Sequence, residues 1–293
     1  MTASRAALST PSQPFKGILL ILLATFLFAS HDALSKYLSG FYPVVMVVWA
    51  RYVVHTLLMA GIFLPQSGLR VLRSNRPGLQ ALRAGCLLGT SFFFTSSLLF
   101  IPLAEATAVN FLAPLLVTAL SVPLLGESVS RRQWIAVLVG FVGVLIIVHP
   151  GGELFKPAIL LPFCSAMCFS CYQILTRILS KYDSPTTSNF FAGLFNTLLV
   201  SSIVPFFWQV PSLTHGLLML ALGTCGMTAH LFLTQAFRSA PPALLAPFGY
   251  CQIVFAGLLG FVVFAHTPDL STLIGIVVIC LSGLAAAWEQ GRR

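Results

Sequence analysis

Ten long apolar runs constrain this chain more than any other feature of its sequence. Each run is close to the roughly 20 residues that an α-helix needs to cross a bilayer. Of the 293 residues, 57% are hydrophobic and only 8% are charged, whereas soluble domains carry roughly 25% charged residues. The sequence therefore predicts an all-α integral membrane protein. The expected spans are 16–38, 43–64, 79–101, 104–125, 133–149, 158–179, 185–208, 215–237, 242–265 and 271–288.

The basic residues lie mostly between the apolar runs, on one side of the predicted membrane. The chain has 16 Lys and Arg against 7 Asp and Glu, for a net charge of +9, but no soluble basic segment is left over. Nucleic-acid binding is therefore not expected. Lys and Arg collect in cytoplasmic loops, and this rule places both termini in the cytoplasm, with Arg83 among the inner basic residues and Lys156 alone in an outer loop. We expect a multi-pass protein of a bacterial inner membrane.

The first apolar run is expected to be a retained helix. A cleaved signal peptide has an apolar core of about 7 to 15 residues followed by a small-residue cleavage site. The run that begins near residue 16 continues, through weaker sequence, to Leu38. It is therefore too long for a signal peptide and forms the first predicted span.

An internal repeat divides the chain into two halves. Residues 30–39 line up with residues 171–180, so that polar, basic and small residues coincide. Five spans is an odd number, so the two halves must face opposite ways across the membrane, as inverted repeats do in many secondary transporters. The predicted organisation is an N-terminal cytoplasmic tail (1–15), a first five-helix repeat (16–149), an external linker (150–157), a second five-helix repeat (158–288) and a C-terminal cytoplasmic tail (289–293).

The run 104–147 resembles the EamA-type five-helix module of the drug/metabolite transporter superfamily. The resemblance is carried by the stretch 104–108 (AEATA), Pro114, the stretch 125–127 (LGE) and the glycine-rich stretch 140–144, and the second half repeats it with Ala265-His266 in place of Gly-Glu. It implies two inverted five-helix repeats that carry a small molecule by alternating access. Within the superfamily the chain is most similar to aromatic amino-acid exporters, which implies export of amino acids, especially aromatic ones.

Three charged residues fall within predicted spans near the outer side. Asp32 and Lys36 are four residues apart, so they share one face of the first helix, and Arg51 lies at a comparable depth in the second. Charges inside a membrane are costly, so they mark either a pathway or a pair. Two interpretations stay open, an ion pair that clamps the first two helices and a role in substrate binding or proton coupling.

Other polar residues within the spans are candidates for a substrate cavity. His230 and Thr234 share a helix face, and their partners in the repeat are Phe92 and Ser96. Such residues line a cavity or form hydrogen bonds between helices, and the sequence does not distinguish these two roles. Pro114 and Pro247 interrupt two spans and are candidate hinges or bends. The candidate substrate-binding residues are His31, Phe92, Ser96, Asn110, Tyr172, Gln173, His230, Thr234, Gln235, Tyr250 and Gln252.

Motifs for other classes of protein do not stand out in the sequence. There is no phosphate-binding loop, the six histidines are scattered, and the C-x-x-C of Cys168 and Cys171 lies within a span, where packing is expected. We therefore expect no catalytic residue, metal or cofactor. The expected partners are a small-molecule substrate and the lipid bilayer, with the chain as a monomer or weak dimer. A carrier of another metabolite or drug, a channel and a membrane-embedded enzyme remain as alternatives.

Overall fold

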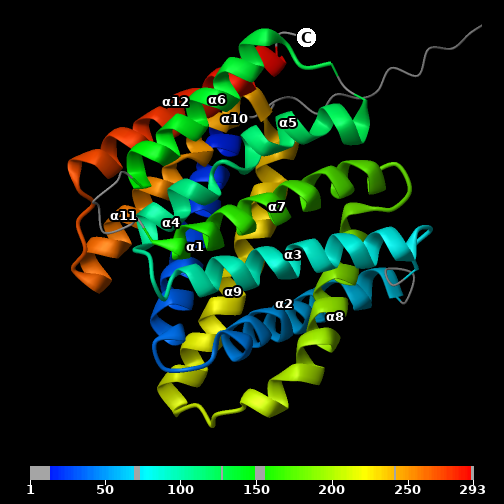
Figure 1. Cartoon of the computed structure of the whole chain (residues 1–293). Helices are drawn as coiled ribbons and strands as arrows, with labels where there is room; N and C mark the ends of the chain where they lie inside the picture. Colours follow the sequence, from blue (N-terminus) through cyan, green and yellow to red (C-terminus); the bar gives the residue numbers. More distant parts are fainter. Residues whose placement is uncertain (1–13, 69–72, 127, 149–155, 241, 292–293) are drawn as a thin grey trace, which may run out of the picture.

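The computed structural model describes residues 14–68, 73–126, 128–148, 156–240 and 242–291, and the described residues are helical without strands. Most of the predicted tails and of the linker lies outside the described residues. Each expected span contains one helix or, in two cases, a consecutive pair, which confirms the predicted all-α membrane fold (Figure 1). The elements are α1 (Pro14–Ser39), α2 (Val44–Ser67), α3 (Pro77–Ser97), α4 (Leu103–Asn110), α5 (Ala113–Leu125), α6 (Arg131–Val148), α7 (Leu160–Leu179), α8 (Pro185–Ile203), α9 (Leu213–Ser239), α10 (Pro242–Gly249), α11 (Cys251–Phe264) and α12 (Leu270–Gly291), with 3-10 turns η2 (Pro157–Ile159) and η3 (Val204–Phe207).

Nine of the described helical segments are long and apolar enough to cross a membrane, and α3 completes ten. The α3 helix is more polar because neighbouring helices cover it: it packs against α2, α7 and α8, and its Gln80 and Arg83 are buried. Its carboxyl end lies beside Lys36 near the end of α1, whereas its amino end lies beside the loop between α7 and α8. It therefore runs from one end of the bundle to the other, as the remaining segments do.

The packing of the helices repeats itself between the two halves. The first half holds α1 to α6 and the second holds α7 to α12, with α4–α5 and α10–α11 each counting as one segment. The α1 helix packs along α9, and its counterpart α7 packs along α3, the counterpart of α9. The α6 and α12 helices, which lie side by side at one edge in Figure 1, are counterparts of each other, as are α2 and α8. This exchange of partners is what two inverted repeats produce.

Individual residues obey the same symmetry. The shift that aligns residues 30–39 with 171–180 also aligns Thr56 of α2 with Thr197 of α8, and these two hydroxyls are 2.9 Å apart. Phe111 lies in the break between α4 and α5 and Tyr250 in the break between α10 and α11, and their rings pack at 5.3 Å. The pseudo-twofold axis therefore passes between α2 and α8 and between the two breaks.

The two broken segments also end alike. Gly126 after α5 and Ala265 after α11 both have left-handed backbone, with φ of 68° and 53°. They are as far apart in the sequence as Phe111 and Tyr250. Gly126 suits this helix-ending conformation because it has no Cβ, whereas Ala265 adopts it at some cost. The substitution of Ala265 for glycine noted in the second repeat thus leaves the backbone unchanged.

Glycines set the contact between α6 and α12. A Cβ on Gly143 would lie 3.1 Å from the Gly275 carbonyl oxygen, and one on Gly275 would lie 2.6 Å from the Gly143 oxygen. The backbones of counterpart helices therefore touch at this crossing, as at other small-residue contacts between membrane helices. Gly89, Gly223 and Gly226 make close contacts elsewhere, but Gly85 has open space beside it.

We expect Gly275→Ala to lower the thermal unfolding midpoint of the purified protein. The added methyl would lie 2.6 Å from the Gly143 carbonyl oxygen of α6, and overpacking of this kind costs about 1–3 kcal/mol. Gly85→Ala is the matched control, because no atom lies within 4 Å of its Cβ position. Equal midpoints for the two variants would contradict the close crossing.

Polar contacts join the two halves at one end of the bundle, which we call the Asp183 end. Asp183, in the turn between α7 and α8, accepts hydrogen bonds from Ser74, from the backbone N–H of Asn75 at 2.9 Å and from Gln80 Nε2 at 2.8 Å. The Asn75 side chain donates a further bond to the same carboxylate. Burial by itself would raise the pKa of Asp183, but these hydrogen bonds outweigh it and hold the pKa below its usual value.

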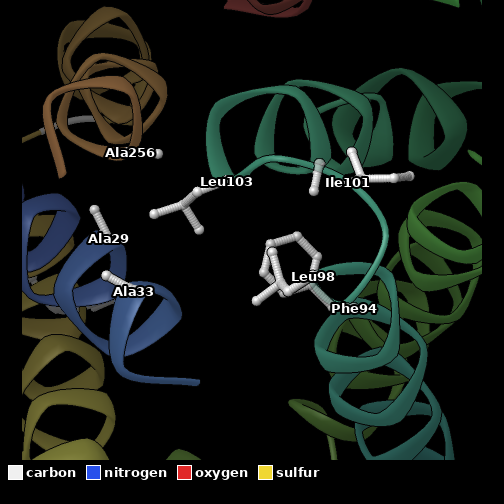
Figure 2. Close-up of a cluster of buried hydrophobic side chains, with 8 residues drawn as sticks. Ala29, Ala33, Phe94, Leu98, Ile101, Leu103 and Ala256 are labelled. Atoms are coloured by element: carbon white, nitrogen blue, oxygen red, sulfur yellow. The ribbon is translucent and has the colours of Figure 1, made fainter. Parts of the chain in front are cut away.

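Other contacts join the halves at the opposite end, which we call the His215 end. The Tyr42 hydroxyl lies 2.8 Å from His215 Nδ1, and Glu105 at the start of α4 lies 2.9 Å from His266 Nε2 after α11. An apolar cluster packs nearby, in which Ala29 and Ala33 of α1 meet residues from the end of α3, the start of α4 and α11 (Figure 2). The two halves are thus in contact at both ends.

We expect Asp183→Asn to lower the thermal unfolding midpoint at neutral pH, because the hydrogen bonds to a charged acceptor weaken by about 1–3 kcal/mol in total. A depressed native pKa stabilises the fold above the unfolded value of 3.8. This stabilisation is lost as the pH falls through the native pKa. The difference between wild type and variant should therefore be constant from about pH 5 upward and shrink below pH 4.

Arg132→Gln is the control for Asp183→Asn. Its side chain is 75% exposed and pairs with Glu289 at 3.5 Å, and exposed pairs of this kind contribute little. A wild-type midpoint for Asp183→Asn at every pH would show that the Asp183 contacts do not hold the two halves together.

Candidate functional site

A hollow between the two halves is lined by residues from five helices. Arg51, Tyr52 and His55 come from α2 and Leu87 from α3, while α7, α8 and α9 of the second half contribute Tyr172, Asn189, Ala192, Gly193 and His230. We call this hollow the central cavity. By the shift that relates the repeats, Ala192 is the counterpart of Arg51 and Gly193 is the counterpart of Tyr52. The cavity therefore lies at the pseudo-twofold axis, and the large residues Arg51 and Tyr52 of α2 have small counterparts in α8.

Arg51 contributes the positive charge at the wall of the cavity. One of its terminal nitrogens donates to Ser91 Oγ at 3.1 Å, and its guanidinium lies 5.5 Å from the ring centre of Tyr52. The Tyr52 hydroxyl is 2.8 Å from the same Ser91 oxygen. Among the described residues, no carboxylate forms an ion pair with Arg51.

Arg83 lies behind the cavity and is 1% exposed. Its donors bond to Thr176 Oγ1 at 2.6 Å, the Ser188 carbonyl at 2.8 Å, the Tyr172 hydroxyl at 2.8 Å and Asn189 Oδ1 at 3.1 Å. The guanidinium also lies 4.4 Å from the Tyr172 ring centre. Arg83 thereby fixes the positions of two cavity residues, Tyr172 and Asn189, from the opposite half of the protein.

Two histidines form part of the cavity wall. His55 lies one helical turn after Arg51, and its ring centre is 6.2 Å from that of His230 on α9. His230 in turn packs edge-on against Phe28 of α1, at 4.9 Å. These rings present aromatic surface together with nitrogens that donate or accept hydrogen bonds. They suit a substrate that is partly flat and apolar and partly polar.

A second polar group lies on α1, where α9 and α11 pack against it. His31 Nδ1 is 3.0 Å from Asp32 Oδ1, and Gln252 Nε2 of α11 donates to Asp32 Oδ2 at 3.1 Å. The His31 ring lies against Gly226, whose Cβ position is 3.1 Å from its Cδ2 atom. His31 Nε2 is buried without a hydrogen-bond partner in the described part of the chain. The candidates His31 and Gln252 are thus brought together through Asp32.

The ion pair that was one interpretation of Asp32, Lys36 and Arg51 is not among the contacts of the described residues. Lys36 Nζ instead donates to the carbonyls of Leu98 at 2.6 Å and Ile101 at 2.9 Å. The carbonyls at a helix end lack partners within the helix and attract cations. Lys36 therefore caps α3, while Asp32 and Arg51 belong to separate groups.

Several other candidates are away from the cavity. Phe92 is 41% exposed, Gln235 is also exposed, and neither lines the cavity. Thr234 is exposed too, and its hydroxyl donates to the His230 carbonyl of its own helix. Ser96 and Gln173 are half-buried and do not line the cavity.

The remaining candidates have packing contacts near the two helix breaks. Asn110 Oδ1 accepts from Ser165 Oγ at 2.9 Å, which ties the first break to α7. The Tyr250 ring packs on Phe111 and reaches Gly283 of α12. Pro114 lies in the first turn of α5, just after one break, and Pro247 lies inside α10, just before the other.

Sequence reasoning missed several residues of the site. Arg83 was counted only among the inner basic residues, but it is buried and bonded to cavity residues. The spacing of His55, four residues after Arg51, placed it on the same helix face and was an available signal. The sequence held no signal of this kind for four other lining residues, because their roles depend on which faces of α2 and α8 meet. These residues are Tyr52, Asn189, Ala192 and Gly193.

Comparison with solved structures supports the arrangement of the helices. A crystal structure that is 24% identical in sequence aligns with 97% of this chain and 100% of its own, with a TM-score of 0.66. This likeness establishes the shared fold.

Curated relatives cover nearly the whole chain and are transporters by name. The S-adenosylmethionine uptake transporter of Rickettsia felis is 27% identical over 94% of this chain and 93% of its own length. The riboflavin transporter of Vibrio cholerae is 28% identical over 96% of both chains, and the pseudopaline exporter of Pseudomonas aeruginosa is 29% identical over 92% and 95%.

A family model matches each half of the chain separately. It describes the EamA-like transporter family, and it matches residues 15–149 and residues 156–286. These matches agree with the repeated packing and with a cavity between the halves. The chain thus belongs to the EamA-like transporter family and is a small-molecule transporter with multiple membrane spans.

Proposed function

We propose that this protein is a secondary transporter that exports amino acids, especially aromatic ones, across a bacterial inner membrane by alternating access. The observation that carries the proposal is the central cavity, which lies at the axis between the repeats and is lined by polar and aromatic side chains from both. In transporters built from inverted repeats the substrate binds at this interface.

Contacts at both ends of the bundle supply the gates that alternating access requires. At the Asp183 end the halves are joined by Asp183 with Ser74, Asn75 and Gln80, and at the His215 end by Tyr42 with His215. Release of one set while the other remains would open the cavity to one side only. The sets consist of hydrogen bonds between loops and helix ends, which separate without unfolding a helix.

The distribution of charge supports a cytoplasmic location for the Asp183 end. Lys16 begins α1, Arg131 and Arg132 begin α6, and Arg238 ends α9, all at the end of the bundle that holds Asp183. Lys181 lies beside Asp183 itself. Basic residues prefer the cytoplasmic side, so the proposal has both termini in the cytoplasm.

The lining of the cavity supports an aromatic substrate. Tyr52, Tyr172, His55 and His230 supply ring surfaces, while Asn189 and Arg51 supply polar groups. S-adenosylmethionine and riboflavin, named for two relatives, both contain a flat heteroaromatic ring. The same relatives favour a second candidate, a carrier for a larger aromatic metabolite, in which transport runs inward.

Flux into liposomes that contain the purified protein tests the proposal. We expect saturable uptake of radiolabelled tryptophan or phenylalanine that the unlabelled amino acid competes. His230→Ala should lower this flux about threefold to tenfold, the effect of one lost hydrogen bond or ring contact. The variant should insert normally.

Thr224→Ala is the matched control on the same helix, because Thr224 is exposed and bonds only to the Leu220 carbonyl among the described residues. Saturable flux of S-adenosylmethionine or riboflavin, without flux of amino acids, would favour the second candidate. Flux that never saturates would indicate a pore and would contradict both carrier proposals.

A further inference from the structure

The central cavity carries the positive charge of Arg51, and its lining, taken over the described residues, includes no acidic side chain. Arg51 lines it directly, Arg83 lies behind Tyr172 and Asn189, and the remaining lining residues are neutral or histidine. In the described part of the chain two buried carboxylates have other partners: Asp32 Oδ1 lies 3.0 Å from His31 Nδ1, and Glu105 Oε1 lies 2.9 Å from His266 Nε2. A low-dielectric cavity that carries one sign of charge concentrates ions of the opposite sign.

The two arginines differ in how many of their hydrogen-bond donors are used. Arg83 makes four side-chain hydrogen bonds, so its guanidinium is nearly satisfied by the protein. Among the described residues Arg51 makes one side-chain hydrogen bond, to Ser91. A guanidinium has five N–H donors in a planar fork, so Arg51 retains most of its donors for a ligand, and Arg83 does not.

Arg51 does not reach back toward the membrane surface. It lies seven residues into α2, about 10 Å from the helix start at 1.5 Å per residue. Ser91, which it contacts, lies six residues before the end of α3, about 9 Å from that end. The guanidinium therefore stays level with its own backbone, whereas an arginine that snorkels points its charge to the headgroups.

The counterpart of Arg51 in the second repeat offers no counter-ion. Ala192 occupies that position, lines the same cavity and presents a methyl group. An unpaired arginine within a membrane is costly and is retained where it serves a function. Arg51 therefore brings to the cavity a charge, and N–H donors, that its counterpart in the second repeat does not neutralise.

We infer that Arg51 binds the carboxylate of the transported molecule. This inference rests on the proposed function, because it assigns a role within the same cavity. The carboxylate takes two parallel N–H donors of the guanidinium, the geometry that makes arginine selective for carboxylates. The rest of the molecule extends toward Tyr172, His55 and His230. The site accepts aromatic acids with or without an amino group and rejects aromatic amines.

Ligand-induced thermal stabilisation of the purified wild-type protein tests the assignment with three compounds. L-Phenylalanine has a carboxylate and an amine, 3-phenylpropanoate has only the carboxylate, and phenethylamine has only the amine. A ligand that binds the native state raises the midpoint with its concentration. We expect the first two to stabilise the protein and phenethylamine to have no effect.

Two variants and one control separate the role of Arg51 from an effect on folding. Arg51→Gln should abolish stabilisation by both acids, and Arg51→Lys should weaken it about tenfold while it keeps the preference for acids over the amine. Arg132→Gln, which removes an exposed charge far from the cavity, should behave as wild type. If Arg51→Gln cannot be purified, the Lys variant still decides the question through its acid preference.

Three results would overturn the inference: stabilisation of wild type by phenethylamine as strong as by the acids, undiminished acid binding in Arg51→Gln, or binding of neither acid. The proposed function is tested separately from the role of Arg51, by flux in liposomes. Binding of acids through Arg51 without flux of amino acids in liposomes would remove the exporter proposal and leave the carboxylate site. Saturable amino-acid flux that both Arg51 variants retain would remove the carboxylate site and leave the exporter proposal.

Discussion

The absence of water in the hydrocarbon core is the constraint from which the rest of this structure follows. Every backbone N–H and C=O within the membrane must find a partner in the protein, so the spans are helical. Where a segment breaks, as beside Phe111 and Tyr250, the break is covered by its counterpart from the other half. The same constraint gathers polar side chains between helices, because there they have partners. Arg83 shows the result, with four hydrogen bonds to α7 and α8.

The inverted symmetry of the two halves determines where the central cavity lies. Counterpart helices meet at the axis, and contacts such as Thr56 with Thr197 and Gly143 with Gly275 join the halves there. The central cavity lies on the same axis but is not itself symmetric. Arg51 and Tyr52 of the first half correspond to Ala192 and Gly193 of the second, and all four line the cavity. The shared fold thus supplies the position of the cavity, and the differences between the repeats supply its shape and charge.

The candidate site was predicted less well than the fold, for reasons that particular residues make clear. His230 and Tyr172 were expected at a cavity and line one. Phe92, the sequence partner of His230, is 41% exposed and does not line the cavity. Lys36 was expected to pair with Asp32 on the same helix face, yet the carbonyls of Leu98 and Ile101 at the end of α3 bind it instead. Helical spacing identifies side chains of one helix that can meet. It does not predict which groups another helix contributes to the same place.

The sequence by itself determined that the chain is an all-α membrane protein with about ten spans, that its halves repeat and that it resembles transporters. These properties are local or periodic, since the length of apolar runs, the charge of loops and repeated spacing can be read directly from the sequence. Only the tertiary structure decided which face of each helix looks into the cavity, that Arg83 is satisfied and that Arg51 is left with free donors. Helix rotation and partner choice depend on packing between segments more than a hundred residues apart, as between Arg83 and Asn189, and no local pattern carries that information.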